Sequence, residues 1–574
     1  MTQNIDAMAH ITLNHARLGA IKGIRDTQTS LIKLLGLPYG TIPQRFGRAE
    51  PLKSLQHSPR FQNTVFDATK PGASSVQPWG SVTMDASNIP LPTDNLPDDE
   101  EQSEDCLNLS IRLPPTCLNS DGHLRSDAKL PVLVFIHGGA FFLGSANRPY
   151  YDPSNLVQHG IQRGTPFVMV SVNYRLGILG FMHSPSTGGL IPENNGLYDQ
   201  DLALSWVKEN IGGFGGDVDN ITVIGQSAGG ESVSVRTIRD PVFKRAIAFS
   251  GTPVTMPSMT PSEHHANFLS QAESLGIQMK DSAGKERDAK TIADDFINAD
   301  VQKIRELAWV GLPCAETDFF PVEKPSMELT KKGKLAPENW KDKFTPVEAQ
   351  IVGSTTYDGG ISYNMMSKDD SRKDHAKAFE KIAKEVLGDN EGANLCSIYG
   401  LKTLTPDPDA LQAVCLFESD IGFFAAALAT VEANLIPKTY FHIFDLPNPF
   451  DGPIRKQGEF ATHTFDIVTL LGGVHEDRLP EAYVPVVSKW RDTILDFVVD
   501  GTPPCKEYIS AGTKERRGLM VNKDGVRDVG EAEWLHNDEG RRRRLFELAQ
   551  RVKGDAGCDV LWMEVGRRFL MKGE

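Results

Sequence analysis

A β-branched run that breaks into a glycine-flanked serine constrains the fold of this chain more than any other feature. Residues 221–230 read ITVIGQSAGG, a strand-like segment followed by Ser227 and a helix start. A serine at a sharp strand-to-helix turn exposes its Oγ above the sheet, and Gly225 and Gly229 avoid collisions with the neighbouring strand and helix. The pattern predicts a nucleophile elbow centred on Ser227. A serine in an ordinary tight turn is the simpler alternative.

A second glycine-containing loop follows a buried strand. Residues 130–142 read LPVLVFIHGGAFF, so an apolar run ends in HGGA. The backbone of Gly138 and Gly139 can turn N–H groups towards the serine, joined by the N–H of Ala228, and such donors stabilise a tetrahedral oxyanion. The alternative is a glycine turn after a strand, in which His137 has a structural role.

These segments belong to an ordered set of blocks along nearly the whole chain. The blocks are LLGLPYGTIPQRF (34–46), SEDCLNLSI (103–111), HGGAFFLGS (137–145), VSVNYRLGILGF (170–181), NNGLYDQDLALSWVKENIGGFGGDVDNITVIGQSAGG (194–230) and FSGTP (249–253). With them the chain resembles the type-B carboxylesterases, the cholinesterase-like branch of the α/β-hydrolases. The resemblance implies an α/β-hydrolase fold, a large and mostly parallel sheet flanked by helices, with long inserted loops over an active-site gorge. It also implies oxyanion donors at Gly139, Ala140 and Ala228, with Gly138 giving the loop its freedom.

The acid of a catalytic triad follows the serine in this fold, and the histidine follows the acid. Residues 349–359 read AQIVGSTTYDG, a short strand and a loop that carries Asp358. The loop aligns with a family pattern that has Glu at this position. Asp is one methylene shorter, and either carboxylate can orient and stabilise an imidazolium. We therefore predict Asp358 as the acid, with an aspartate in a surface turn as the alternative.

The predicted base is His463. Residues 460–467 read FATHTFDI after a strand-like segment and resemble the histidine loop of the family. His475 is the rival, although it lacks this pattern. Asp466 follows the histidine and is better interpreted as a residue that braces the loop than as the triad acid.

These residues predict a serine esterase that works through an acyl-enzyme on a small-molecule ester. No metal-ligand spacing or phosphate-binding loop suggests a metal or an organic cofactor. Gln226 replaces a Glu that many relatives carry, which favours a neutral ester over a choline ester. An acyltransferase or a lactone-forming tailoring enzyme of secondary metabolism would use the same triad. Relatives that lost the nucleophile act as binding modules, and the presence of Ser227 and His463 argues against that function.

The length and the helical patterns are consistent with one domain over residues 1–574. The chain is 40% hydrophobic, enough for a large core. Apolar residues recur at helical spacing in 201–211 and 375–387, and a third stripe, with Val487, Trp490, Ile494 and Phe497, ends at Gly501. We predict that these stripes face the core.

Charge and cysteine usage bear on partners and compartment. With a net charge of -15, Arg541 to Arg544 are interpreted as the exposed face of a terminal helix, without a nucleic-acid partner, and the acidic run 94–105 as solvated surface. No stretch approaches the ~20 apolar residues of a membrane span. Residues 1–30 lack the apolar run of a signal peptide, and no cysteine precedes Cys106, whose counterpart in secreted relatives forms a disulfide. We expect a cytoplasmic protein similar to intracellular fungal members of the family. The natural substrate and the oligomeric state do not follow from the sequence.

Overall fold

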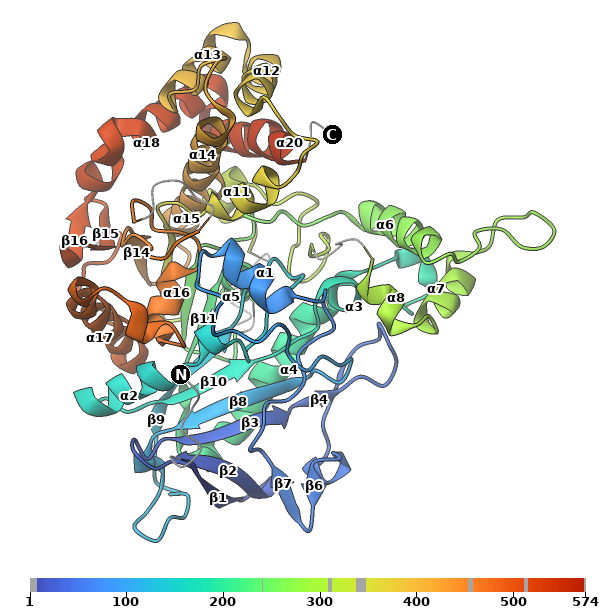
Figure 1. The fold of residues 1–574 in the computed structure, drawn as a ribbon, viewed down its shortest axis with the longest axis vertical. Coiled ribbons are helices and arrows are strands. Elements are labelled where there is room, and N and C mark those ends of the chain that lie inside the picture. Colours follow the sequence, from blue (N-terminus) through green and yellow to red (C-terminus); the bar gives the residue numbers. More distant parts are fainter. Residues whose placement is uncertain are drawn as a thin grey trace.

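A mixed β-sheet of fourteen strands, counted over the described residues, runs through the protein (Figure 1). The computed structural model describes residues 8–571 apart from 240, 308–311, 337–346, 453–457 and 510–514. The strands are β1 (Met8–His15), β2 (Gly19–Asp26), β3 (Ile32–Pro38), β4 (Gly40–Thr41), β5 (Glu50–Pro51), β6 (Phe61–Gln62), β7 (Val65–Asp67), β8 (Asn108–Leu113), β9 (Leu130–Ile136), β10 (Val168–Val172), β11 (Gly216–Gln226), β12 (Arg245–Phe249), β13 (Ala349–Thr355), β14 (Lys438–Phe444), β15 (Arg517–Asn522) and β16 (Gly525–Gly530). β4 and β5 pair separately as a two-stranded sheet.

The centre of the large sheet is parallel. Its strand order is β16-β15-β14-β13-β12-β11-β9-β10-β8-β3-β2-β7-β6, with β1 paired to β2. From β10 to β15 each neighbouring pair is parallel, and antiparallel strands flank this block on both sides. β9 and β11 are adjacent, so the loops at their carboxyl ends emerge side by side. Ligand sites in open parallel sheets lie at this edge.

Helices cover both faces of the sheet. The α-helices are α1 (Ser81–Asn88), α2 (Ser154–Arg163), α3 (Gly177–Phe181), α4 (Asn195–Asn210), α5 (Ala228–Arg236), α6 (Pro261–Ser274), α7 (Ala289–Ile297), α8 (Val301–Arg305), α9 (Met327–Lys331), α11 (Gly360–Ser367), α12 (His375–Leu387), α13 (Asp389–Ile398), α14 (Asp407–Glu418), α15 (Ala425–Glu432), α16 (Phe465–Leu471), α17 (Val484–Asp500), α18 (Glu531–Lys553), α19 (Gly557–Asp559) and α20 (Arg567–Leu570). Alternate residues of β9 point to opposite faces: Val134 lies in the core beneath α4 and α5, and Phe135 lies in the core beneath α2 and α17.

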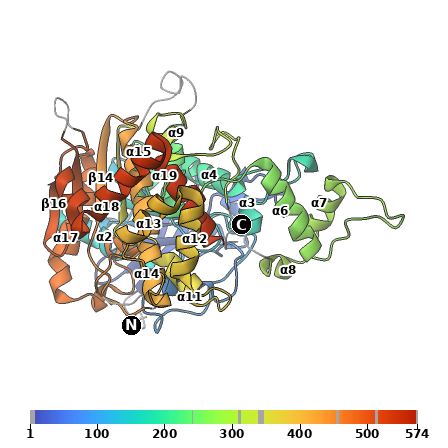
Figure 2. The same ribbon diagram turned by 90° about the horizontal axis from the view of Figure 1, so that it is seen from above.

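The predicted core-facing stripes are confirmed. α12 spans the predicted residues 375–387 and buries Phe379, and α17 buries Trp490 and Ile494. α17 ends at Gly501, whose φ of 79° is a left-handed conformation that glycine adopts without strain. Figures 1 and 2 both show α6, α7 and α8 projecting from one side of the protein, where they enclose a separate small core.

One long helical stretch runs from Asp407 to Glu432, with a π-helical segment, Ser419–Phe424, between α14 and α15. It is the one helix among the described residues with the length and apolarity of a membrane span, and 83% of that window is buried inside the protein. Burial of this kind is typical of a core helix. Ser419 and Phe423 of this stretch contact the candidate active site described below.

Two interpretations of charged segments as solvated surface were partly wrong, because each segment is in part exposed or half-buried but also contributes to a buried ion pair. Arg541 and Arg542 are buried, and both pair with the fully buried Asp420. The acidic run is also not entirely solvated, because Glu100 lies 3.1 Å from the guanidinium of the buried Arg148. In both cases the partner is distant in sequence.

Candidate active site

Ser227 occupies the turn between β11 and α5. Its backbone has φ 57° and ψ −126°, an unfavourable conformation for a side chain, and the residue is 7% exposed. A Cβ on Gly225 would lie 2.1 Å from the carbonyl oxygen of Gly229, and one on Gly229 would lie 2.1 Å from that of Ile136. Both glycines are therefore required by close backbone contacts. The predicted elbow geometry is present.

The loop after β9 lies against this turn. A Cβ on Gly138 would come within 2.9 Å of the Cβ of Ser227, so this position must be glycine. Gly139 and Ala140 continue with φ values of 106° and 54°. Among the described residues, none accepts a hydrogen bond from the backbone N–H of Gly139, Ala140 or Ala228. Three donors beside the serine are thus free to bind an oxyanion.

His137 of the same loop has a structural role. It is buried and stacks on Tyr174 with ring centroids 4.5 Å apart, and its Nδ1 contacts the carbonyl oxygen of Gly138 at 2.8 Å. Burial lowers the pKa of His137 to about 4. The ring is therefore neutral and supports the loop.

Asp358 and His463 are in direct contact. Nδ1 of His463 lies 2.7 Å from Oδ1 of Asp358, and both residues are buried. The other carboxylate oxygen accepts the backbone N–H of Thr355 at 3.0 Å. Tyr357 and Thr462 form a parallel β-bridge, which joins the two loops one residue before the acid and the base. This bridge holds the two loops together next to the acid and the base.

The other ring nitrogen of His463 faces Gln226. The amide Nε2 of Gln226 donates to Nε2 of His463 at 3.1 Å, and the hydroxyl of Thr464 donates to Oε1 of Gln226 at 3.1 Å. Among the described contacts none joins Ser227 Oγ to the ring. Catalytic hydrogen bonds of this kind often form only when substrate is bound. Phe423 packs its ring edge-on against His463, with centroids 5.4 Å apart.

The rival assignments lie elsewhere. His475 is buried against Phe450, with ring centroids 5.7 Å apart, and contacts neither Ser227 nor Asp358 in the described structure. Asp466 is fully buried, and its Oδ1 accepts the N–H of Ile467. Burial and the charge of Asp358 raise the pKa of Asp466 well above its usual value. Asp466 therefore braces the loop and is not placed as the triad acid.

A cavity of about 720 Å³ opens beside the oxyanion loop. Gly139 and Ala140 line it together with residues of α1 and α11. Trp79 lines it too and is 60% exposed beneath the guanidinium of Arg305, 3.8 Å from the ring centroid. Sequence reasoning missed Asp85, a buried carboxyl group in the same wall, because no motif surrounds it.

A parallel sheet with an elbow serine after one strand and an acid and a histidine after later strands defines the α/β-hydrolase fold. The model of the carboxylesterase family matches residues 10–524, and the chain belongs to this family. It is 37% identical over 265 residues to para-nitrobenzyl esterase of Bacillus subtilis (strain 168), covering 45% of this chain and 47% of that protein. It is 35% identical over 254 residues to acetylcholinesterase of Danio rerio, covering 42% and 35% of the two chains.

These alignments span less than half the length of those two relatives. A solved structure of a PNB esterase matches the fold over 93% of this chain and 100% of that one, with a TM-score of 0.66 and 23% identity. Family and fold therefore agree with the resemblance inferred from the sequence blocks.

Proposed function

We propose that this protein hydrolyses neutral carboxylic esters through a Ser227–His463–Asp358 triad and an acyl-enzyme. The observation that carries the proposal is the 2.7 Å contact between His463 and Asp358, on loops that meet at the same sheet edge as Ser227. The free N–H groups of Gly139, Ala140 and Ala228 support it. Membership of the carboxylesterase family is consistent with this chemistry.

The reaction then follows from the geometry. Substrate binding replaces Gln226 with the Ser227 hydroxyl at Nε2 of His463, and His463 takes the proton as Oγ attacks the ester carbonyl. Asp358 stabilises the imidazolium, and the three N–H groups hold the oxyanion. His463 protonates the leaving alcohol, and water then releases the acid by the same steps in reverse. No cofactor takes part in the proposed steps.

The neutrality of the substrate is inferred from Gln226, which lies beside both the nucleophile and the base. A carboxylate at this position would favour cationic substrates, whereas an amide supplies hydrogen bonds without charge. We also propose an intracellular setting, because all seven cysteines are free in the structure.

A panel of p-nitrophenyl esters from acetyl to palmitoyl tests the activity. Comparison of kcat/KM for butyrylthiocholine and its uncharged isostere, over a range of ionic strength, tests the preference for a neutral over a cationic ester. We expect the neutral ester to be the better substrate, with little salt dependence. Preference for the cation at low salt contradicts the neutral-ester assignment, and failure to turn over any ester contradicts the proposed function.

A further inference from the structure

The wall of the cavity described above contains the carboxyl group of Asp85, which has no role in the proposed triad. Asp85 belongs to α1 and lines the same cavity as Gly139 and Ala140, in a wall that is otherwise mostly apolar or uncharged. It is 6% exposed. Burying a carboxyl group is costly unless it is hydrogen-bonded. The hydrogen-bond partners of Asp85 therefore bear on its function.

Asp85 is held from one side only. Its Oδ2 accepts a hydrogen bond from the hydroxyl of Tyr150 at 2.5 Å and lies 4.0 Å from Nε of Arg148. Among the described residues, Oδ1 of Asp85 has no hydrogen-bond partner. A fixed carboxyl group with one free oxygen is suited to accept a hydrogen bond from a ligand in the cavity.

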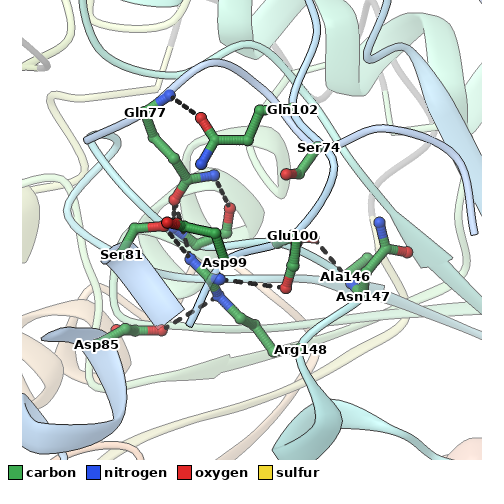
Figure 3. Close-up of polar contacts among 12 residues, drawn as sticks. Ser74, Gln77, Ser81, Asp85, Asp99, Glu100, Gln102, Ala146, Asn147 and Arg148 are labelled. Atoms are coloured by element: carbon green, nitrogen blue, oxygen red, sulfur yellow. Dashed lines mark hydrogen bonds and ion pairs between the residues drawn. The ribbon is translucent and has the colours of Figure 1, made fainter. Parts of the chain in front are cut away.

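A network behind Asp85 fixes Arg148 in place (Figure 3). Arg148 is 1% exposed, pairs with Glu100 at 3.1 Å, and donates to Oε1 of Gln77 at 2.9 Å and to the hydroxyl of Ser81 at 3.1 Å. The guanidinium is thus shared between two carboxyl groups and cannot turn towards the cavity without losing these contacts. Its charge offsets that of Asp85, which weakens any attraction of Asp85 for a cation.

The cavity connects Asp85 to the reacting centre. Gly139 and Ala140, whose N–H groups face the oxyanion in the proposed function, line the same cavity. Burial raises the pKa of Asp85, and the charge of Arg148 and the hydrogen bond from Tyr150 lower it in part. Because Asp85 lines the same cavity as the oxyanion loop, an ester whose carbonyl oxygen is held by that loop would place one of its two substituents in the cavity with Asp85.

We propose that Asp85 is a specificity-determining residue that accepts a hydrogen bond from an uncharged hydroxyl group, alcoholic or phenolic, on the substituent of the ester that occupies the cavity. This inference rests on the proposed function and names a class of substrate for it, hydroxylated neutral esters. A hydroxyl group is favoured over a cation because Arg148 lies behind Asp85 and Lys368 lies in the cavity wall. Loss of such a hydrogen bond typically changes kcat/KM by about 10- to 100-fold.

The test uses triplets of neutral p-nitrophenyl and alkyl esters that differ only in carrying hydrogen, hydroxyl or methoxy at one position, placed on the acyl or the alcohol part. In the wild-type protein we expect the hydroxyl member of at least one triplet to exceed the other two in kcat/KM by about tenfold or more. Asp85→Ala should remove this preference and leave kcat/KM for the hydrogen member within about threefold. The control is Thr83→Val in the same wall, whose hydroxyl is already engaged with the carbonyl oxygen of Gly80; it should keep the preference.

If loss of the carboxyl group in the Asp85→Ala protein disrupts α1, Asp85→Asn serves as a second variant that tests the same contact. In this variant the hydroxyl of Tyr150 can donate to the amide oxygen, so the amide NH₂ faces the cavity as a hydrogen-bond donor. The ratio of kcat/KM for methoxy esters to kcat/KM for hydroxyl esters should therefore increase. The inference is overturned if no triplet shows a hydroxyl preference in the wild-type protein, if Asp85→Ala lowers all three members equally, or if a cationic analogue exceeds the hydroxyl ester. Turnover of the hydrogen members establishes ester hydrolysis independently of these ratios; if no ester is turned over, the proposed function fails and this inference fails with it.

Discussion

The amide of Gln226 donates a hydrogen bond to Nε2 of His463 at 3.1 Å, the nitrogen that must receive the Ser227 proton in the proposed reaction. This contact requires a neutral ring whose Nδ1–H faces Asp358. Gln226 therefore occupies the ring nitrogen that must accept the proton, and it has to leave this nitrogen before Ser227 can bind there.

The first prediction concerns this contact. Gln226→Glu places a carboxylate beside the ring, which favours the imidazolium, so less neutral base is present at a given pH. The acidic limb of the kcat/KM profile should move to higher pH by about one unit or more. Gln226→Met removes the amide without adding charge and should not move this limb upward. If the acidic limb of the profile does not move in the Gln226→Glu protein, residue 226 does not influence the protonation of His463, and the prediction is wrong.

The second prediction ranks the two buried aspartates. Asp358→Asn removes the charge that stabilises the imidazolium and should lower kcat by about 10⁴. Asp466→Asn should cost less than about tenfold, because Asp466 makes no hydrogen bond or ion pair with His463 among the described residues and an amide can keep its contact with Ile467. Steady-state kinetics on both variants, with melting temperatures as the control for folding, gives the ranking. The reverse order contradicts the assignment of the acid.

The third prediction concerns stability and Glu418, which lies beneath the loop of Asp358 and accepts the hydroxyl of Ser362 at 2.9 Å. Burial and the charge of Asp358 raise the pKa of Glu418 to about 8. The folded protein keeps this proton where the unfolded chain has lost it, so this contribution to stability falls as pH rises from 4.5, the usual value, to about 8.

Glu418→Gln removes that contribution. Its free energy of unfolding, relative to that of the wild-type protein, should increase between pH 5 and pH 8 by about 1 kcal/mol or more. Chemical denaturation at the two pH values measures the change. A difference that is constant with pH shows that Glu418 is ionised in the folded protein.

Periodic patterns and adjacent motifs were predictable from the sequence, since they depend on residues close in the chain. The elbow around Ser227 and the stripes of α12 and α17 follow from steric needs and helical spacing within a few residues. Asp358 and His463 could be predicted as the acid and the base because the order of the triad restricts the search to residues after Ser227. Their contact depends on the bridge between Tyr357 and Thr462, which only the folded loops show.

Contacts between distant polar residues were not predictable. Arg542 follows Asp420 by 122 positions, so a charged run that is typical of a solvated helix face turned out to be partly buried. Asp85 lies in a segment without any catalytic motif, and its place in the cavity depends on Tyr150 and Arg148, 65 and 63 residues further along the chain. Such pairings depend on tertiary structure, which one sequence does not reveal.

The fourth prediction tests the intracellular setting. All seven cysteines should react with a thiol reagent after denaturation of the purified natural protein without reductant, as expected for a reducing compartment. Mass spectrometry counts the labels, and a sample reduced before labelling is the control. Five labels or fewer without reductant indicate a disulfide and an oxidising compartment.

The central claim is that Ser227 carries the acyl group, and trapping that intermediate tests it most directly. Wild-type protein is mixed with a p-nitrophenyl ester and quenched in acid, and the acylated peptide is mapped by mass spectrometry, with Ser227→Ala as the matched control. We predict an acyl group on Ser227, none in the variant, and turnover by the variant lower by at least about 10³. An acyl group on another residue, or undiminished turnover by a folded Ser227→Ala protein, would contradict the account.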